Sequence, residues 1–193
     1  ESGIPADASR FYIFYNRPEK SDTQFIWKDF QEKYNGELIG NLGNLVNRTL
    51  TFVSRYYDGT VPAGTVDEGL WQQVRASQQR ITELLEWAEL KDAFREMFAL
   101  SSIANKAFQD GEPWKTRTEA PEKAASLIMN LCYIIKDLMI LAHPYMPQFT
   151  EKVMSYFGKE LEMLTIAECA SLISITNNPS LFDPYNDEVF MFE

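Results

Sequence analysis

The sequence predicts an all-α protein: a bundle of about five helices with a short N-terminal connector and a partly irregular C-terminal tail. Apolar residues recur at spacings of three, four and seven over long stretches, which is the period of one helix face. Glycine, proline, asparagine and aspartate residues separate these stretches. No stretch shows the apolar–polar alternation of a half-buried strand, so the pattern favours helices throughout.

Three regions divide the 193 residues. We expect residues 1–26 to form a connector, residues 27–158 to form the bundle, and residues 159–193 to form a tail that packs on the bundle. The connector carries a short helix around Phe11. That helix ends before Pro18, because the residue before a proline is pushed out of the helical region.

The first long helix of the bundle is expected over about 27–57, and Asp58-Gly59 stops it. Three glycines lie within about two turns of this helix, at positions 36, 40 and 43. Each costs a helix roughly 1 kcal/mol relative to alanine, so their presence indicates a close approach of something to the helix. Packing against a neighbouring helix is the alternative.

The remaining helices follow from caps and stops. Thr65 and Glu68 have the spacing of a capping box, and the helical pattern then continues over about 67–109. A single helix of that length is improbable in a compact domain, so we place a break near residues 87–89. Two further helices are expected over about 118–142 and 147–157, after a loop over 112–117.

Composition limits the functions open to the chain. The net charge is −10, from 18 basic and 28 acidic residues. Bulk attraction to nucleic acid is therefore weak, and any polyanion must meet a local basic or aromatic patch. The only charges between residues 38 and 57 are Arg48 and Arg55, and Lys115 and Arg117 directly follow Trp114. These are the candidate patches. DNA is not an expected partner.

The cysteines and the apolar runs indicate the cellular compartment in which the protein is expected. Cys132 and Cys169 lie far apart, without a CxxC motif or metal spacing. We expect free thiols in a reducing compartment, with a disulfide as the alternative, and a cytoplasmic protein. No apolar run approaches the length of a membrane span, so no membrane partner is expected.

The sequence offers no recognisable catalytic set. His143 is the single histidine, and its place at a helix end favours a capping or structural role. There is no GxSxG, P-loop or GxGxxG motif. We therefore expect no catalytic residue, no metal site and no cofactor in this chain.

Two features favour recognition of an unstacked base. Asn44 and Arg48 are four residues apart, so they project side by side and combine an amide with a planar fork of donors. Trp114 follows Pro113 in the expected loop, where an exposed indole suits stacking on a single-stranded base. The alternatives are solvated polar residues and an indole folded onto the bundle. The other tryptophans, Trp27, Trp71 and Trp87, are expected in the core.

Several stretches resemble methionyl-tRNA synthetase, a class I aminoacyl-tRNA synthetase. The likeness spans roughly residues 3–160 and weakens beyond. It is carried by Ile4-Pro5-Ala6-Asp7, Arg10-Phe11-Tyr12, Asn35-Gly36-Glu37-Leu38, Gly43-Asn44-Leu45-Val46-Asn47-Arg48, Asn105-Lys106, Pro113-Trp114 and His143-Pro144-Tyr145-Met146-Pro147.

The resemblance implies an anticodon-binding helical bundle that recognises the CAU anticodon of tRNA(Met). By position, Trp114 would stack on the first anticodon base, Asn44 and Arg48 would hydrogen-bond the splayed bases, and Pro113 would hold the indole. The family's HIGH and KMSKS signatures and its zinc knuckle are absent here. ATP and zinc would therefore be bound by a catalytic region of the same polypeptide before residue 1, and the chain alone is expected to be inactive.

Two other functions compete with this one. The anticodon domains of other class I synthetases share the helical architecture. A helical protein-interaction module without RNA binding is the alternative from a different class, and it would show an exposed apolar patch.

Overall fold

A computed structural model describes residues 4–19 and 22–158, and every regular element within them is helical. The all-α prediction is confirmed. In chain order the elements are α1 (Ala6–Tyr15), α2 (Trp27–Lys33), η1 (Tyr34–Gly43), α3 (Asn44–Tyr56), α4 (Glu68–Glu86), α5 (Leu90–Gly111), α6 (Pro113–Glu119), α7 (Pro121–Ala142) and α8 (Pro147–Gly158).

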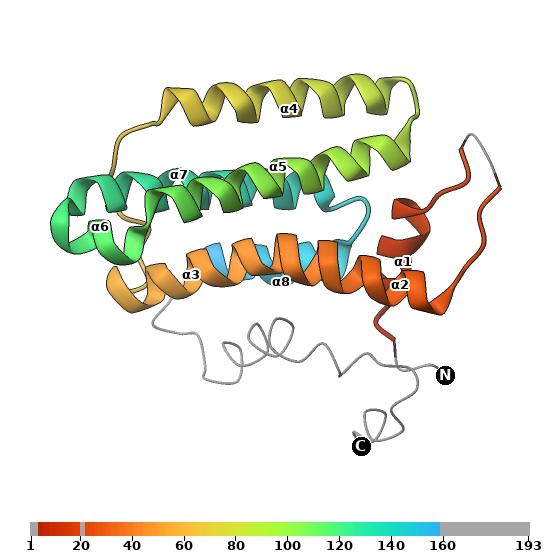
Figure 1. Cartoon of the computed structure of the whole chain (residues 1–193), viewed down its shortest axis with the longest axis horizontal. Helices are drawn as coiled ribbons and strands as arrows, with labels where there is room; N and C mark the ends of the chain where they lie inside the picture. The colour runs from red at the N-terminus through yellow and green to blue at the C-terminus, as the bar shows by residue number, and fades with distance from the viewer. Residues whose placement is uncertain (1–3, 20–21, 159–193) are drawn as a thin grey trace, which may run out of the picture.

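The described residues form seven helices, two more than expected, when α2, η1 and α3 are taken as one continuous rod. Figure 1 shows α5 and α7 in the middle of the bundle, with α4 along the outer side of α5 and the α2–η1–α3 rod on the opposite side. The short helix α1 lies at one end and α6 at the other. The expected tail, with Cys169, lies outside the described residues.

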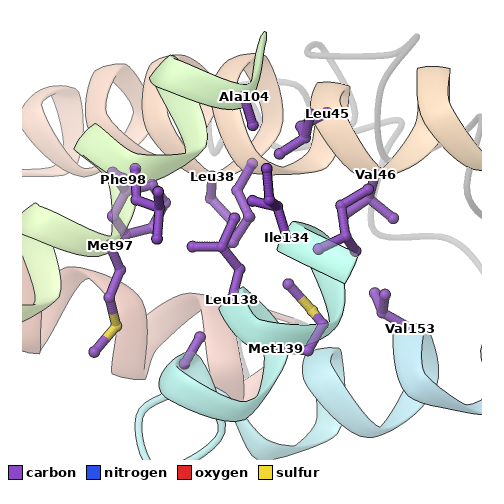
Figure 2. Close-up of a cluster of buried hydrophobic side chains, with 14 of the residues drawn as sticks. Leu38, Leu45, Val46, Met97, Phe98, Ala104, Ile134, Leu138, Met139 and Val153 are labelled. Atoms are coloured by element: carbon purple, nitrogen blue, oxygen red, sulfur yellow. The ribbon is translucent and has the colours of Figure 1, made fainter. Parts of the chain in front are cut away.

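The core is built where these helices face one another. Figure 2 shows apolar side chains from the long rod, α5, α7 and α8 converging between the ribbons. Leu45, Leu100, Ile134 and Ile135 have no exposed surface. Each fully buried Leu or Ile stabilises the fold by roughly 1.5–3 kcal/mol, so this seam is the main source of stability.

Helix α1 is tied to the bundle by aromatic packing and by polar contacts. The ring of Phe11 is fully buried, and its centroid is 5.5 Å from that of Phe98. Arg10 Nε donates to the carbonyl of Tyr145 over 2.8 Å, and Asp7 Oδ2 accepts from the backbone N–H of Phe149 over 2.7 Å. The connector helix thereby packs against the start of α8.

The break predicted in the long helical pattern is confirmed. Helix α4 ends at Glu86 and α5 begins at Leu90. Ala88 between them has a φ of 57°, a left-handed conformation that a helix cannot continue through. The turn reverses the chain, so that α4 and α5 pack along each other.

The predicted capping box at Thr65 is wrong. The N-cap of α4 is Asp67, whose Oδ1 accepts from the backbone N–H of Leu70 over 3.0 Å. Thr65 instead donates its backbone N–H to Ser126 Oγ on α7, and Glu68 pairs with Arg75. Docking of the 60–67 segment on α7 therefore moves the N-cap two residues later, from Thr65 to Asp67.

Two of the three tryptophans expected in the core are exposed. Trp71 is half-buried, and its Nε1 donates to Asn130 Oδ1 over 2.7 Å. Trp87 is 81% exposed, because it lies just past the end of α4, where the helical face no longer continues. Trp27 begins α2 and forms an exposed apolar patch with Phe25 and Ile26.

Helix α7 corrects the expectation that no segment approaches a membrane span. Its 22 residues are long and apolar enough to cross a membrane by length and composition. Half of that stretch is buried inside the bundle, against α3, α5, α6 and α8. The apolar surface of α7 is therefore accounted for by helix packing in the fold, as in the central helix of a globular domain.

Candidate nucleic-acid interface

The helical rod changes pitch just before the candidate site. Residues 34–43 form a π-helix, and the backbone N–H of Asn44 reaches back to the carbonyl of Ile39, five residues earlier. A Cβ on Gly40 would lie 2.9 Å from the carbonyl oxygen of Asn35, which is too close for a side chain. The close approach that the glycines indicated is thus made by the rod's own backbone.

Asn44 and Arg48 open the α-helical part of the rod and line one shallow hollow of about 390 Å³ facing α5. The remaining lining residues are Gly36, Glu37, Gly40, Asn41, Ser102 and Asn105. The predicted side-by-side placement of the amide and the guanidinium is therefore present in the structure. Both side chains are half-buried, so each keeps an edge open to a ligand.

A chain of side-chain amides orients Asn44. Its Nδ2 donates to Asn105 Oδ1 over 3.5 Å, while Asn105 Nδ2 donates to the backbone carbonyl of Asn41 over 2.9 Å. Asn41 Nδ2 in turn donates to Ser102 Oγ over 2.9 Å. Asn44 thus uses one amide N–H on Asn105, and its carbonyl oxygen has no hydrogen-bond partner among the described residues, so it is available as an acceptor.

Arg48 is held by an aromatic ring. Its guanidinium carbon lies 3.7 Å from the centroid of Phe108 on α5, a close cation–π contact. Partial burial lowers the pKa of Arg48, although a guanidinium stays charged at neutral pH. Stacking leaves the planar edge of donors free for hydrogen bonds in the plane of the group.

The sequence predicted a loop around Trp114, but in the structure this residue lies in a helix. Glu112 takes a left-handed φ of 40° that turns the chain out of α5, and Pro113 then begins α6 at its first position, where a proline fits a helix. Pro113 is buried, and it fixes the start of a helix that carries Trp114 at its second residue.

The indole of Trp114 is 40% exposed and tilts by 30° against Phe108, with 6.1 Å between ring centroids. The same phenyl ring therefore contacts Arg48 from α3 and Trp114 from α6. Sequence reasoning missed Phe108 because it falls on the apolar stripe of α5, like any core residue. Its role is visible only in the structure, where its ring contacts both Arg48 and Trp114.

Histidine, cysteine and acidic side chains are dispersed over residues 4–19 and 22–158. No group of three or more His, Cys, Asp and Glu side chains there is placed to hold a metal ion. His143 lies at the end of α7, with its Nδ1 atom 2.9 Å from Thr150 Oγ1. An amide, a guanidinium and an exposed indole can read and stack a base, but they cannot move a proton or activate a nucleophile.

Comparison with known proteins decides the family. Residues 59–184 match the family described as the anticodon binding domain of methionyl tRNA ligase. The chain belongs to this family. Residues 1–50 match the class I tRNA synthetases (M), so the candidate residues are divided between two matches, with Asn44 and Arg48 in one and Trp114 in the other.

Curated methionine–tRNA ligases are similar along most of the chain. The enzyme of Treponema denticola is 60% identical over 172 residues, which cover 83% of this chain and 22% of that protein. The enzyme of Treponema pallidum is 52% identical, covering 83% of this chain and 21% of that protein. The chain thus spans about a fifth of the length of these ligases.

Solved structures show the same fold. The apo form of Mycobacterium tuberculosis methionyl-tRNA synthetase aligns with a TM-score of 0.71 at 21% identity, covering 84% of this chain and 34% of that one. The same synthetase bound by methionyl-adenylate aligns with a TM-score of 0.74, with the same identity and coverage. The helical arrangement is therefore retained where most of the sequence has changed.

Proposed function

We propose that this chain reads the CAU anticodon of tRNA(Met) for a cytoplasmic methionine–tRNA ligase. The observation that carries the proposal is the shared contact of Arg48 and Trp114 with Phe108, beside the hollow that Asn44 lines. Aromatic stacking platforms next to fixed polar edges are what recognition of splayed single-stranded bases requires. Family membership makes an anticodon the fitting ligand.

Each residue has a distinct role in this proposal. Trp114 stacks on the first anticodon base, the cytosine, with its exposed indole face, and Pro113 holds the helix that presents it. The Asn44 carbonyl accepts from an exocyclic amino group, while one N–H of its amide is held by Asn105. Arg48 supplies a planar fork of donors to base acceptors. Stacking is worth roughly 1–3 kcal/mol per base.

The whole ligase would attach methionine to the tRNA with ATP, and its catalytic region would be the partner of this chain within one polypeptide. ATP and any zinc would be bound in that region; the described part of this chain has no group of three or more His, Cys, Asp and Glu side chains placed to hold a metal ion. The chain alone should leave ATP–pyrophosphate exchange at the background rate. Methionine-dependent exchange above background would contradict the assignment of catalysis to another region of the polypeptide.

Arg48→Ala tests the anticodon proposal against a series of RNA stem-loops that differ in the anticodon. We expect the wild-type chain to prefer CAU and the variant to lose that preference, because the donor fork is gone. Arg48→Lys is the matched control: it keeps the charge but not the planar fork, so it should restore affinity without restoring discrimination. An equal loss for every anticodon would make Arg48 a phosphate contact.

A further inference from the structure

Three arginines stand apart from the rest among the described residues. Arg48, Arg55 and Arg117 donate no hydrogen bond and form no ion pair there. The other arginines are each engaged by a carboxylate or a backbone carbonyl: Arg10, Arg17, Arg75, Arg80 and Arg95. The guanidinium donors left free in this acidic protein are therefore gathered on α3 and α6.

Each free guanidinium lies over an aromatic ring. Arg48 lies over Phe108, whereas Arg55 and Arg117 share the ring of Tyr56, at 5.5 and 4.3 Å from its centroid. Two like charges at one half-exposed ring repel each other, and an anion bound between them would relieve that repulsion. Stacked guanidiniums still present their donor edges, which match two oxygens of a phosphate.

The shared ring lies along the course of the proposed anticodon site. Arg55 follows Arg48 by seven residues, so it lies on nearly the same face of α3, two turns or about 10.5 Å further on. Arg117 follows Trp114 by three residues, one turn along α6. Figure 1 shows the C-terminal end of α3 beside α6 at one end of the bundle. An RNA strand that extends from Trp114 and Arg48 toward this end of the bundle therefore meets Arg55 and Arg117 next.

Nearby lysines do not compete for this role. Lys115 is bound by Glu112 over 2.8 Å, a hydrogen bond that raises the pKa of Lys115, and Lys106 is bound by Asp110 over 2.5 Å. An ammonium that is paired with a carboxylate attracts a phosphate less than an unpaired guanidinium does. On α6, the free guanidinium of Arg117 is therefore a better phosphate ligand than the paired ammonium of Lys115.

A hollow of about 680 Å³ opens beside the shared ring. Its lining includes Tyr56, Tyr57, Arg117, Pro121 and Ser126. Glu122 also faces it, which disfavours a phosphate inside the hollow. The charges therefore favour a phosphate at the Arg55 and Arg117 guanidiniums rather than beside Glu122, and an uncharged ribose against the tyrosines.

We propose that Arg55, Tyr56 and Arg117 form a second RNA subsite, which binds the backbone phosphate of a single-stranded nucleotide flanking the anticodon bases. This inference rests on the proposed function, because it extends the same RNA strand along α3 and α6. Unlike Asn44 and Arg48, the subsite contacts phosphate and sugar, so it adds affinity without adding sequence preference.

The test is binding of RNA anticodon stem-loops to the 193-residue chain at several salt concentrations. Arg55→Gln with Arg117→Gln should weaken binding by a factor of about ten for CAU and for altered anticodons alike. The dependence of log affinity on log salt should fall by about one unit, as for one lost phosphate contact. Both side chains are exposed, so melting of the variant should match the wild type.

Two controls separate the subsite from general charge effects. Arg80→Gln on α4 removes one charge from a residue paired with Glu83, and it should leave affinity nearly unchanged. Arg55→Lys with Arg117→Lys keeps both charges and should retain the wild-type salt dependence, which also keeps the test valid if the glutamine variant folds poorly.

The outcomes distinguish this inference from the anticodon proposal. Unchanged binding by the glutamine variant, a loss confined to CAU, or an equal loss in Arg80→Gln would overturn the second subsite while the CAU preference of the wild type stands. A wild-type chain that binds no stem-loop would overturn both.

Discussion

At the scale of single residues, Phe108 connects two groups that are 66 positions apart in the chain. Its buried ring supports the guanidinium of Arg48 on α3 and the indole of Trp114 on α6. An aromatic support suits a reading residue better than a carboxylate would, because it orients the guanidinium without consuming its donors. The orientation of Asn44 is fixed in a similar way, through Asn105 rather than through solvent.

Trp114→Ala is the prediction that belongs to this scale. It should cost roughly 1–3 kcal/mol of RNA stem-loop binding, because one stacking face is lost. The indole is 40% exposed, so the midpoint of thermal unfolding should change little. Binding by fluorescence anisotropy and melting by circular dichroism measure the two effects separately.

Trp114→Phe is the matched control, since it keeps a stacking ring and should retain part of the affinity. A large drop in melting temperature in Trp114→Ala, with an unchanged preference among anticodons, would assign the indole to the core instead.

At the scale of elements, the π-helix η1 sets the direction in which Asn44 and Arg48 point. A π-helix has more residues per turn than an α-helix, so η1 rotates the α3 residues that follow it about the rod axis. The direction in which the α3 side chains point therefore depends on η1. Gly40 allows this because its hydrogen atom stands where a Cβ would lie 2.9 Å from the Asn35 carbonyl. A backbone carbonyl cannot swing away as a flexible side chain can.

Gly40→Ala should therefore destabilise the chain, by roughly 1–3 kcal/mol, as overpacking against rigid neighbours does. It should also weaken RNA binding, because relaxing the π-turn would rotate Asn44 and Arg48. Urea unfolding and stem-loop binding measure the two effects.

Gly36→Ala is the control within the same element. Nothing lies within 4 Å of a Cβ at Gly36, so alanine should be neutral or stabilise the rod by up to about 1 kcal/mol. Equal stabilisation by the two substitutions would show that the glycines act through helix propensity rather than through the π-turn.

At the scale of the whole molecule, two buried acids link stability to high pH. Burial raises the pKa of Tyr34 from 10.0 to about 12, and it raises the pKa of the Cys132 thiol from 9.0 to about 12. Both groups stay neutral in the native core, whereas the unfolded chain releases their protons at lower pH. Their contribution to stability is therefore complete below about pH 9 and is lost as pH rises toward 12.

The free energy of unfolding should accordingly be flat near neutral pH and fall from about pH 9 upward, by at most about 1.4 kcal/mol per pH unit for each group. Urea midpoints over this range measure the fall. In Cys132→Ala the decline should begin about one pH unit later, because the remaining buried or partly buried acids with raised pKa values are tyrosines, among them Tyr34 and Tyr15, whose unfolded pKa is higher. Equal profiles for the two proteins would contradict the assignment to Cys132.

Much of the fold was predictable because helices are local structures. The apolar stripe of α7 and the stop after Tyr56 depend on neighbours within a few residues. The break near Ala88 was predicted from the improbable length of a single helix over 67–109. The structure has all three. The expected loop around Trp114 was wrong because Pro113 reads equally as a loop residue or as the first residue of a helix. The division into residues 1–26, 27–158 and 159–193 stays a prediction.

By itself, the sequence determined the all-α class and the pairing of Asn44 with Arg48, since a spacing of four residues places side chains together on any helix. Only the tertiary structure decided that Trp114 and Arg48 meet at Phe108, and that Arg55 and Arg117 share Tyr56. The reason is physical: helical period places residues on a face, but the packing of α3, α5 and α6 around the core selects which faces meet.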